Sequence, residues 1–180
     1  MIRAETADEV QARPVSIRVK TPAERLQLDS REWLLSDASG GYAMGSASGV
    51  PDRRYHGLLT ASLSPPVSRV MLLTSMAEIL WLHPDTPSAK PIDLTDMRFA
   101  DGTLLSGGRD RLISFELGEE AVWTYDVGDG ATLTKRLYLH EQRAAATIRY
   151  ELAGAHGWLQ CRPLMPMRDH HHLNHGPDAT

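Results

Sequence analysis

The sequence is poor in the features that mark several specialised classes of protein. It contains 1 cysteine, Cys161, so the chain forms no internal disulfide, and this usage fits a reducing cytoplasm. Its longest apolar runs, such as residues 70–73, are far too short to span a bilayer. The formal net charge is -4 and the pI is near 6.0, so no basic surplus indicates a nucleic-acid partner. We therefore expect a cytoplasmic protein that binds neither nucleic acid nor membrane.

The overall composition is that of a globular domain. Apolar residues make up 42% of the 180 residues and charged residues 23%, which allows one domain with a substantial core. Residues 1–14 are polar and have no apolar segment of the kind found in signal peptides. We expect this N-terminus to be frayed or disordered and the folded domain to cover residues 15–175.

Short segments of alternating apolar and polar residues, separated by turn residues, predict an all-β fold with few short helices. Segments between residues 112 and 152 recur at roughly ten-residue spacing, which favours an antiparallel meander in a sandwich or barrel. Residues 118–120 and Asp129-Gly130 are the expected turns, and residues 4–11 and 141–145 each suit a helical turn or two. The expected strands are residues 15–19, 70–83 in two runs broken near Thr74, 112–117, 121–127, 132–140, 146–152 and 158–164.

The segment from residue 31 to residue 59 concentrates residues that ordinary strands and helices do not use. Glycines permit backbone conformations with positive φ and close approach of other groups, so we expect them to shape a loop. Arg, Tyr and His side chains bind polyhydroxylated or anionic partners through directional hydrogen bonds. The expected loop-shaping glycines are Gly40, Gly41, Gly45, Gly49 and Gly57, and the binding candidates are Arg53, Arg54, Tyr55 and His56.

This glycine-rich segment matches none of the standard catalytic patterns. It is not a phosphate loop, because Gly-Lys-Ser/Thr does not follow it, and Tyr42 stands where a dinucleotide fingerprint requires glycine. Ala47 lies midway between two glycines, where a nucleophile elbow requires serine. The sequence also has no cysteine pair and no His-Glu-x-x-His motif for zinc. We therefore assign no catalytic residue, no metal and no cofactor.

A run of three histidines near the C-terminus raises the question of a metal site. His170 and His172 share one side of an extended segment, whereas His171 points to the other. Asp169 or His175 is a possible further ligand, but the spacing matches no established ligand set. A polar loop is therefore the favoured interpretation.

Other conspicuous side chains are expected to have structural roles. The four tryptophans are potential platforms for sugar rings, but core packing is favoured for Trp33, Trp123 and Trp158, which lie within apolar segments. Cys161 is expected to be a small buried hydrophobe in its strand. Carboxylates in loop-like segments usually cap turns or helices, and we expect such roles for the aspartates in these segments. They are Asp52, Asp96, Asp101, Asp110 and Asp169.

Several motifs follow one another in a distinctive order. They are Glu32-Trp33-Leu34-Leu35, Gly40-Gly41-Tyr42-Ala43, residues 53–59 (RRYHGLL), Pro65-Pro66-Val67, Arg162-Pro163-Leu164 and Arg168-Asp169-His170. From near Gln27 onward, the chain resembles the N-terminal domain of the archaeal and bacterial type of glycogen debranching enzyme, an amylo-α-1,6-glucosidase. One departure is His171, because that family usually has an aromatic residue at this place.

The resemblance implies a β-sandwich of the large supersandwich type that precedes an (α/α)6 barrel with the catalytic carboxylates. The expected substrate is an α-glucan, glycogen or limit dextrin, and the expected partner is that C-terminal helical barrel. The chain ends at Thr180 without a barrel, so we expect it to be non-catalytic by itself. The residues expected to contact the glucan or to dock onto the barrel are Arg53, Arg54, Tyr55, His56, Arg168, Asp169 and His170.

Two alternatives remain open from the sequence. One is a freestanding carbohydrate-binding sandwich. The other is a structural interaction module without a glycan role, which would be supported if Arg53, Arg54 and His56 were all buried in ion pairs and hydrogen bonds within the domain.

Overall fold

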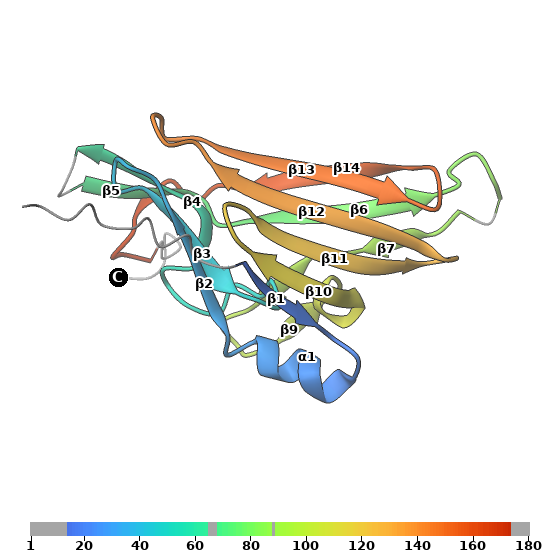
Figure 1. Cartoon of the computed structure of the whole chain (residues 1–180). Coiled ribbons are helices and arrows are strands. Elements are labelled where there is room, and N and C mark those ends of the chain that lie inside the picture. Colours follow the sequence, from blue (N-terminus) through green and yellow to red (C-terminus); the bar gives the residue numbers. More distant parts are fainter. Residues whose placement is uncertain (1–13, 65–67, 88, 174–180) are drawn as a thin grey trace, which may run out of the picture.

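The computed structural model describes residues 14–64, 68–87 and 89–173, which fold mainly into β-strands (Figure 1). The predicted all-β class with few short helices is confirmed. No helix in the described ranges is long and apolar enough to cross a bilayer. The elements are β1 (Val15–Arg18), α1 (Pro22–Leu28), β2 (Glu32–Ser36), β3 (Tyr42–Ser46), β4 (Gly57–Ser64), β5 (Ser68–Leu73), β6 (Ser75–Leu82), β7 (Pro91–Asp93), β8 (Asp96–Arg98), β9 (Leu104–Ser106), the 3-10 helix η1 (Arg109–Arg111), β10 (Leu112–Leu117), β11 (Ala121–Gly128), β12 (Ala131–Leu139), β13 (Ala146–Ala153), β14 (Gly157–Leu164) and β15 (Arg168–Asp169).

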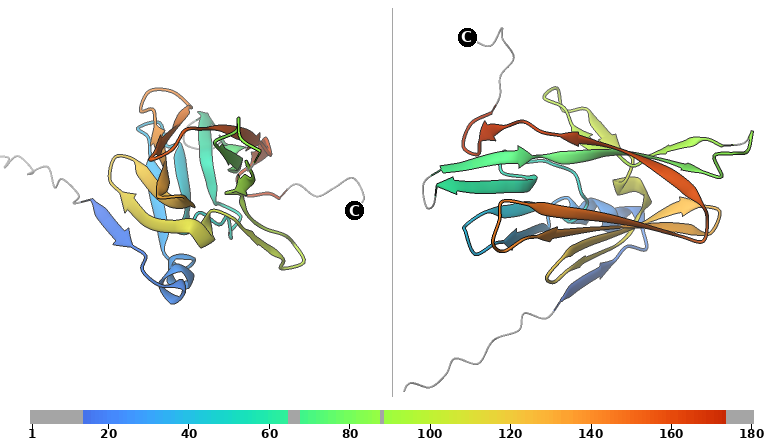
Figure 2. Two further views of the ribbon diagram at one scale, coloured as in Figure 1. Left: turned by 90° about the vertical axis from the view of Figure 1, so that its right-hand side faces the viewer. Right: turned by 90° about the horizontal axis from the view of Figure 1, so that it is seen from above.

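The strands are arranged as a sandwich, and the right-hand view of Figure 2 shows its two layers edge-on. One layer is a five-stranded antiparallel sheet with the order β1-β10-β11-β12-β13, which confirms the predicted meander. The facing layer is a three-stranded sheet with the order β14-β6-β7. A third sheet, β15-β5-β4-β3-β2, lies at one end of this pair, and only Thr74 separates β5 from β6.

Large aromatic side chains fill the core between these sheets. Residues in β11 and β12 alternate regularly between buried positions and positions that are partly buried or, at Asp126, exposed, as expected for strands with one face on the core. The indole rings of Trp33 and Trp123 meet edge to face, with centroids 5.3 Å apart. Their N–H groups donate to the carbonyl oxygens of Ser46, at 3.0 Å, and Ala47, at 3.2 Å. The expected core positions of Trp33 and Trp123 are therefore confirmed, with both buried N–H groups satisfied.

The helical content differs from the expectation. Helix α1 begins with a capping box, in which the Thr21 hydroxyl accepts from the Glu24 N–H and the Glu24 carboxylate accepts from the Thr21 N–H. The sequence carries this signal, with proline at the first helical position, but we did not predict the helix. The expected helical turn at 141–145 is wrong, because these residues form the turn and bend that connect β12 to β13. The helical signal at residues 4–11 and the motif at 65–67 lie outside the described residues.

The segment from 31 to 59 is not one long loop. It contains β2 and β3, which a tight turn at residues 37–41 joins, and the start of β4, which residues 47–56 connect to β3. The Asp37 carboxylate accepts from the N–H groups of Ser39 and Gly41, both at 2.8 Å, and Gly40 has a φ of 85° that favours glycine. A Cβ at Gly41 would collide with the same carboxylate. These glycines therefore form a hairpin turn that holds two strands in register.

Two expectations of burial in β14 are wrong. Trp158 is 54% exposed and Cys161 is also exposed. The reason is topological, because β14 is the edge strand of its sheet and pairs only with β6. The alternation of apolar residues in β14 resembles that of β11. Trp158 lies on the outer face, opposite Trp81, whereas Cys161 lies on the inner face, opposite Glu78, and is exposed at the edge of the sheet.

Candidate functional site

The two groups of candidate site residues meet on the surface although they lie far apart in the chain. Residues 52–56 form the turn before β4, and residues 168–172 comprise β15 and the turn after it. Strand β15 pairs with β5, which brings the second group beside the first. Arg168 Nη2 donates to the Arg54 carbonyl at 2.6 Å, across 114 residues of sequence. We call residues 52–56 and 168–172 together the junction.

Arg168 holds the junction together from inside. Its side chain is almost fully buried and donates to the carbonyl oxygens of Arg54 and of three residues in its own turn, including His172 at 2.5 Å. Nη2 also lies 3.2 Å from Met71 Sδ. Burial lowers the pKa of this guanidinium, but arginine remains charged at neutral pH. Arg168 therefore acts as an internal clamp, and its donors are directed at the protein's own backbone.

His56 is the second buried anchor of the junction. It is 2% exposed, and its Nδ1 accepts from the Asp52 N–H at 3.0 Å. Its Nε2 lies 3.1 Å from Glu32 Oε1, so the hydrogen-bond pattern fits the tautomer with the proton on Nε2. Glu32 also pairs with Arg53 at 2.9 Å, although the Arg53 side chain is 68% exposed. The buried state of His56 matches the structural alternative, whereas the exposed Arg53 does not.

One side of the junction is an aromatic hollow of about 400 Å³. Tyr55 lies at its edge, 37% exposed, with its hydroxyl 3.1 Å from His171 Nδ1. The His170 ring lies against both Tyr55 and Tyr42, with centroids 5.8 Å and 6.3 Å apart. Burial raises the pKa of Tyr42 and lowers the pKa of His170. The hollow therefore presents ring faces together with hydrogen-bonding groups, and the cationic Arg69 also lines it.

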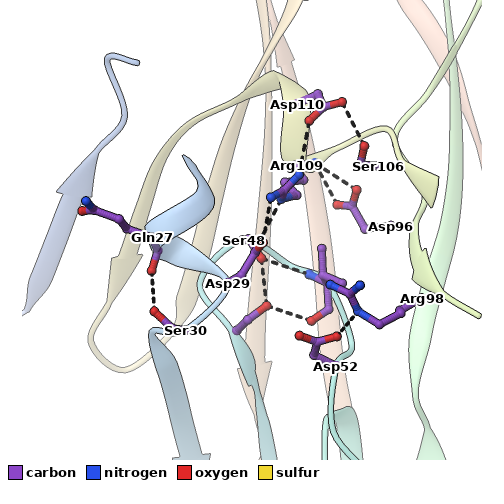
Figure 3. A network of polar contacts seen from close by, with 12 residues as sticks. Gln27, Asp29, Ser30, Ser48, Asp52, Asp96, Arg98, Ser106, Arg109 and Asp110 are labelled. Carbon is purple, nitrogen blue, oxygen red and sulfur yellow. Dashed lines mark hydrogen bonds and ion pairs between the residues drawn. The ribbon is translucent and has the colours of Figure 1, made fainter. Parts of the chain in front are cut away.

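The other side of the junction is an open groove of about 540 Å³. Its polar rim includes Arg53, Arg54 and Arg98, and Arg98 pairs with Asp52 (Figure 3). Met165 and Leu173 contribute apolar surface to its lining and are both about half exposed. We call this feature the arginine groove.

Asp169 organises the histidine run. Its Oδ1 accepts from the His171 N–H at 2.8 Å and pairs with His172 Nδ1 at 3.2 Å. The His171 N–H lowers the pKa of the Asp169 carboxyl. Within the ranges that the structure describes, no three His, Cys, Asp or Glu side chains are grouped to hold a metal ion. His175 lies outside those ranges.

The expected loop-shaping glycines have two kinds of environment. Gly49, like Gly40, has a positive φ, which is 89°. The others lie in close approaches: a Cβ at Gly45 would be 3.3 Å from the Trp33 indole, and one at Gly57 would be 3.1 Å from the Leu73 carbonyl oxygen. Gly45 and Gly57 line the same interior cavity as His56, and Gly57 directly follows His56 in the chain.

The sandwich interior holds a cluster of charges that sequence reasoning missed. Glu78 of β6 and Lys135 of β12 form a buried ion pair at 2.6 Å, and Tyr150 donates to Glu78. Asp96, assigned to a turn from the sequence, begins β8, and burial raises its pKa to about 7 although the Arg109 N–H donates to it. A cavity of about 40 Å³ touches Asp96, Glu78, Lys135 and His56. The sequence did contain a signal for this cluster, because Glu78 and Lys135 are charged residues at inward positions of β6 and β12 that are otherwise apolar.

Polar contacts also anchor the chain beneath the groove (Figure 3). Arg109 binds the Asp29 carboxylate through Nε at 3.0 Å and Nη2 at 2.7 Å, which ties η1 to the end of α1. Ser106 donates to Asp110 at 2.9 Å. Asp110 therefore serves local structure, as expected for this carboxylate.

The fold defines an all-β sandwich domain, and the junction places aromatic and hydrogen-bonding side chains on its surface. Residues 31–180 match the family described as glycogen debranching enzyme N terminal, and the chain belongs to this family. Searches of curated proteins and of solved structures found no match to the chain. The resemblance drawn from the sequence motifs is thereby confirmed.

Proposed function

We propose that this domain serves a cytoplasmic glycogen debranching enzyme that hydrolyses α-1,6 branch linkages of glycogen and limit dextrin. The match of residues 31–180 to the debranching-enzyme family carries the proposal. Glycoside hydrolysis requires two carboxyl groups flanking the scissile bond, and a helical-barrel catalytic domain would supply them. The sandwich contributes by positioning the substrate and that catalytic domain, since correct orientation alone accelerates a reaction strongly.

Domain docking is the role that we assign to the arginine groove. Protein interfaces are enriched in arginine and methionine and are depleted in other charged residues at their centre. The groove combines exposed arginines with the half-exposed Met165 and Leu173, which matches this composition. Arg168 and His56 support the groove from inside, so their role is positional.

Glucan contact is the role that we assign to the aromatic hollow. Aromatic ring faces pack against the C–H faces of sugar rings, and the surrounding hydroxyl groups need hydrogen-bond partners. Tyr55, Tyr42 and the His170–His171 pair offer both kinds of contact within one hollow. His171 takes part through its ring, although the related family usually has another aromatic residue there.

Steady-state release of glucose from a limit dextrin by the complete protein tests both assignments. The double variant Arg53→Ala/Arg54→Ala and the variant Met165→Asp should each lower kcat/KM by about tenfold or more, because they disturb the docking surface. Tyr55→Ala should raise KM several-fold, since it removes a ring from the glucan hollow. The exposed Arg143→Ala, in the turn after β12, is the matched control. Wild-type kinetics in the groove variants would overturn the docking role.

A further inference from the structure

The outer face of the β14-β6-β7 sheet carries a group of aromatic and polar side chains outside the junction. Buried Glu78, Leu80 and Leu82 mark the inner face of β6, so Ile79 and Trp81 point outward. The register pairs Trp81 with Trp158, Ile79 with Gln160 and Ala77 with Arg162, and directly paired residues share a face. Strand β7 adds Pro91 opposite Trp81 and Asp93 opposite Ile79. We call Trp81, Trp158, Gln160, Arg162 and Asp93 the tryptophan face.

Trp81 and Trp158 form an aromatic platform on this face. Their rings are stacked, with centroids 4.5 Å apart and planes 18° from parallel. Trp81 is partly buried and supports Trp158, which is 54% exposed. Tryptophan has only two side-chain torsions, so an exposed indole that already stacks on a second ring gains ligand contact with little loss of conformational freedom.

Hydrogen-bonding groups of different kinds flank the platform. Gln160, one alternate position along β14 from Trp158, carries a donor and an acceptor, and Arg162 follows with donors only. Asp93 on β7 contributes acceptors. On the opposite side of the platform from Arg162, where β6 ends and β14 begins, the ring centroids of His83 and His156 lie 4.7 Å apart. The face therefore combines an apolar ring surface with donors and acceptors of both charge signs.

We propose that the tryptophan face binds an α-glucan chain, as a second glucan site separate from the aromatic hollow. The linkage type in this proposal rests on the proposed function. Pyranose rings present apolar C–H faces to an indole and direct their hydroxyl groups sideways, where Gln160, Asp93 and Arg162 lie. A protein partner fits this face less well than it fits the arginine groove, because polar and charged side chains surround a single aromatic platform here, whereas Met165 and Leu173 add apolar surface to the groove.

Affinity electrophoresis of the chain in native gels containing glycogen tests this site. We expect wild-type mobility to fall with glycogen concentration and Trp158→Ala to bind glycogen about tenfold more weakly. Trp158→Phe, which keeps a ring, should remain within about threefold of wild type. Phe99→Ala is the matched control, since Phe99 is also an exposed ring but follows β8 on another hairpin. It should migrate as wild type does.

Competition in the same gels tests the class of glucan. Soluble maltoheptaose should restore wild-type mobility, whereas cellohexaose should not. Equal competition by both would overturn the assignment to an α-glucan.

Three results would overturn the tryptophan face as a glucan site. They are a wild-type chain that glycogen does not retard, equal retardation of Trp158→Ala and wild type, or loss of binding in Tyr55→Ala alone. None of these contradicts the debranching function, which is judged by release of glucose from a limit dextrin by the complete wild-type protein. Conversely, wild-type activity in the groove variants would leave the binding result for Trp158 standing.

Discussion

The junction and the tryptophan face use polar and aromatic side chains in opposite ways. At the junction, His56 is 2% exposed and Arg168 is 9% exposed, and their donors and acceptors are directed at the protein itself. On the tryptophan face, Trp158 is 54% exposed and stacks on a supporting ring. The residues that attract attention in the sequence therefore serve partly as scaffold, whereas an open platform comes from residues with no motif.

The largest effect is expected from removing the clamp at the junction. Arg168→Ala deprives four backbone carbonyl oxygens of charged donors, and at about 1 kcal/mol each the loss of stability should be about 4 kcal/mol. Urea unfolding followed by circular dichroism measures this. Arg168→Lys should recover part of it, because an ammonium group reaches fewer acceptors. A loss below about 1 kcal/mol in the alanine variant would contradict the scaffold role.

Asp96, which lines the same interior cavity as His56, should make the stability of the domain depend on pH. Its folded pKa of about 7 lies above the ordinary value of 3.8, because burial favours the neutral acid. The folded state therefore holds the extra proton between these values, and the contribution of Asp96 is lost as pH rises through 7. From pH 5 to pH 8 the free energy of unfolding should fall by on the order of 3 kcal/mol more than in Asp96→Asn. Parallel pH profiles of the two proteins would contradict this.

Truncating tryptophans in the two environments sharpens the comparison. Trp158→Ala should lower stability by no more than about 1 kcal/mol, because the ring is more than half exposed. The matched variant Trp123→Ala, at a buried position, should cost about 3–5 kcal/mol. Thermal unfolding of both variants measures the difference. Similar losses would mean that Trp158 supports the core.

The smallest effect is expected for an exposed ion pair of the junction. Arg53→Ala removes the contact with Glu32, and exposed pairs contribute little, so stability should change by less than about 0.5 kcal/mol. Urea unfolding at low and at high salt is the measurement. A loss above about 2 kcal/mol would place Arg53 in the scaffold with Arg168.

Much of the sandwich follows from local sequence patterns. Strands β10 to β13 were predicted because regular alternation and the Asp129-Gly130 turn are both local signals. Strands β2 and β3 were missed because polar and glycine residues mask their alternation. The hairpin turn at Gly40 makes their pairing possible. The capping box at Thr21 was a local signal for α1 that we did not use.

The candidate site depends more on contacts that are distant in sequence. The motifs singled out two segments, and the structure brings them together through the contact of Arg168 with Arg54, which joins positions 114 residues apart. Trp123 and Trp158 occupy similar alternating patterns, and only the strand order reveals that Trp158 lies on an edge strand. The partners of a strand, and hence which of its faces is covered, are not encoded locally.

The most direct test of the contrast between the two regions is hydroxyl-radical footprinting of the chain with and without glycogen, read by mass spectrometry. Oxidation of exposed Trp158 should decrease when glycogen is bound, whereas oxidation of buried Trp123 should stay low and unchanged in both samples. Oxidation of Trp158 at the same rate with saturating glycogen as without it would contradict the assignment of the tryptophan face.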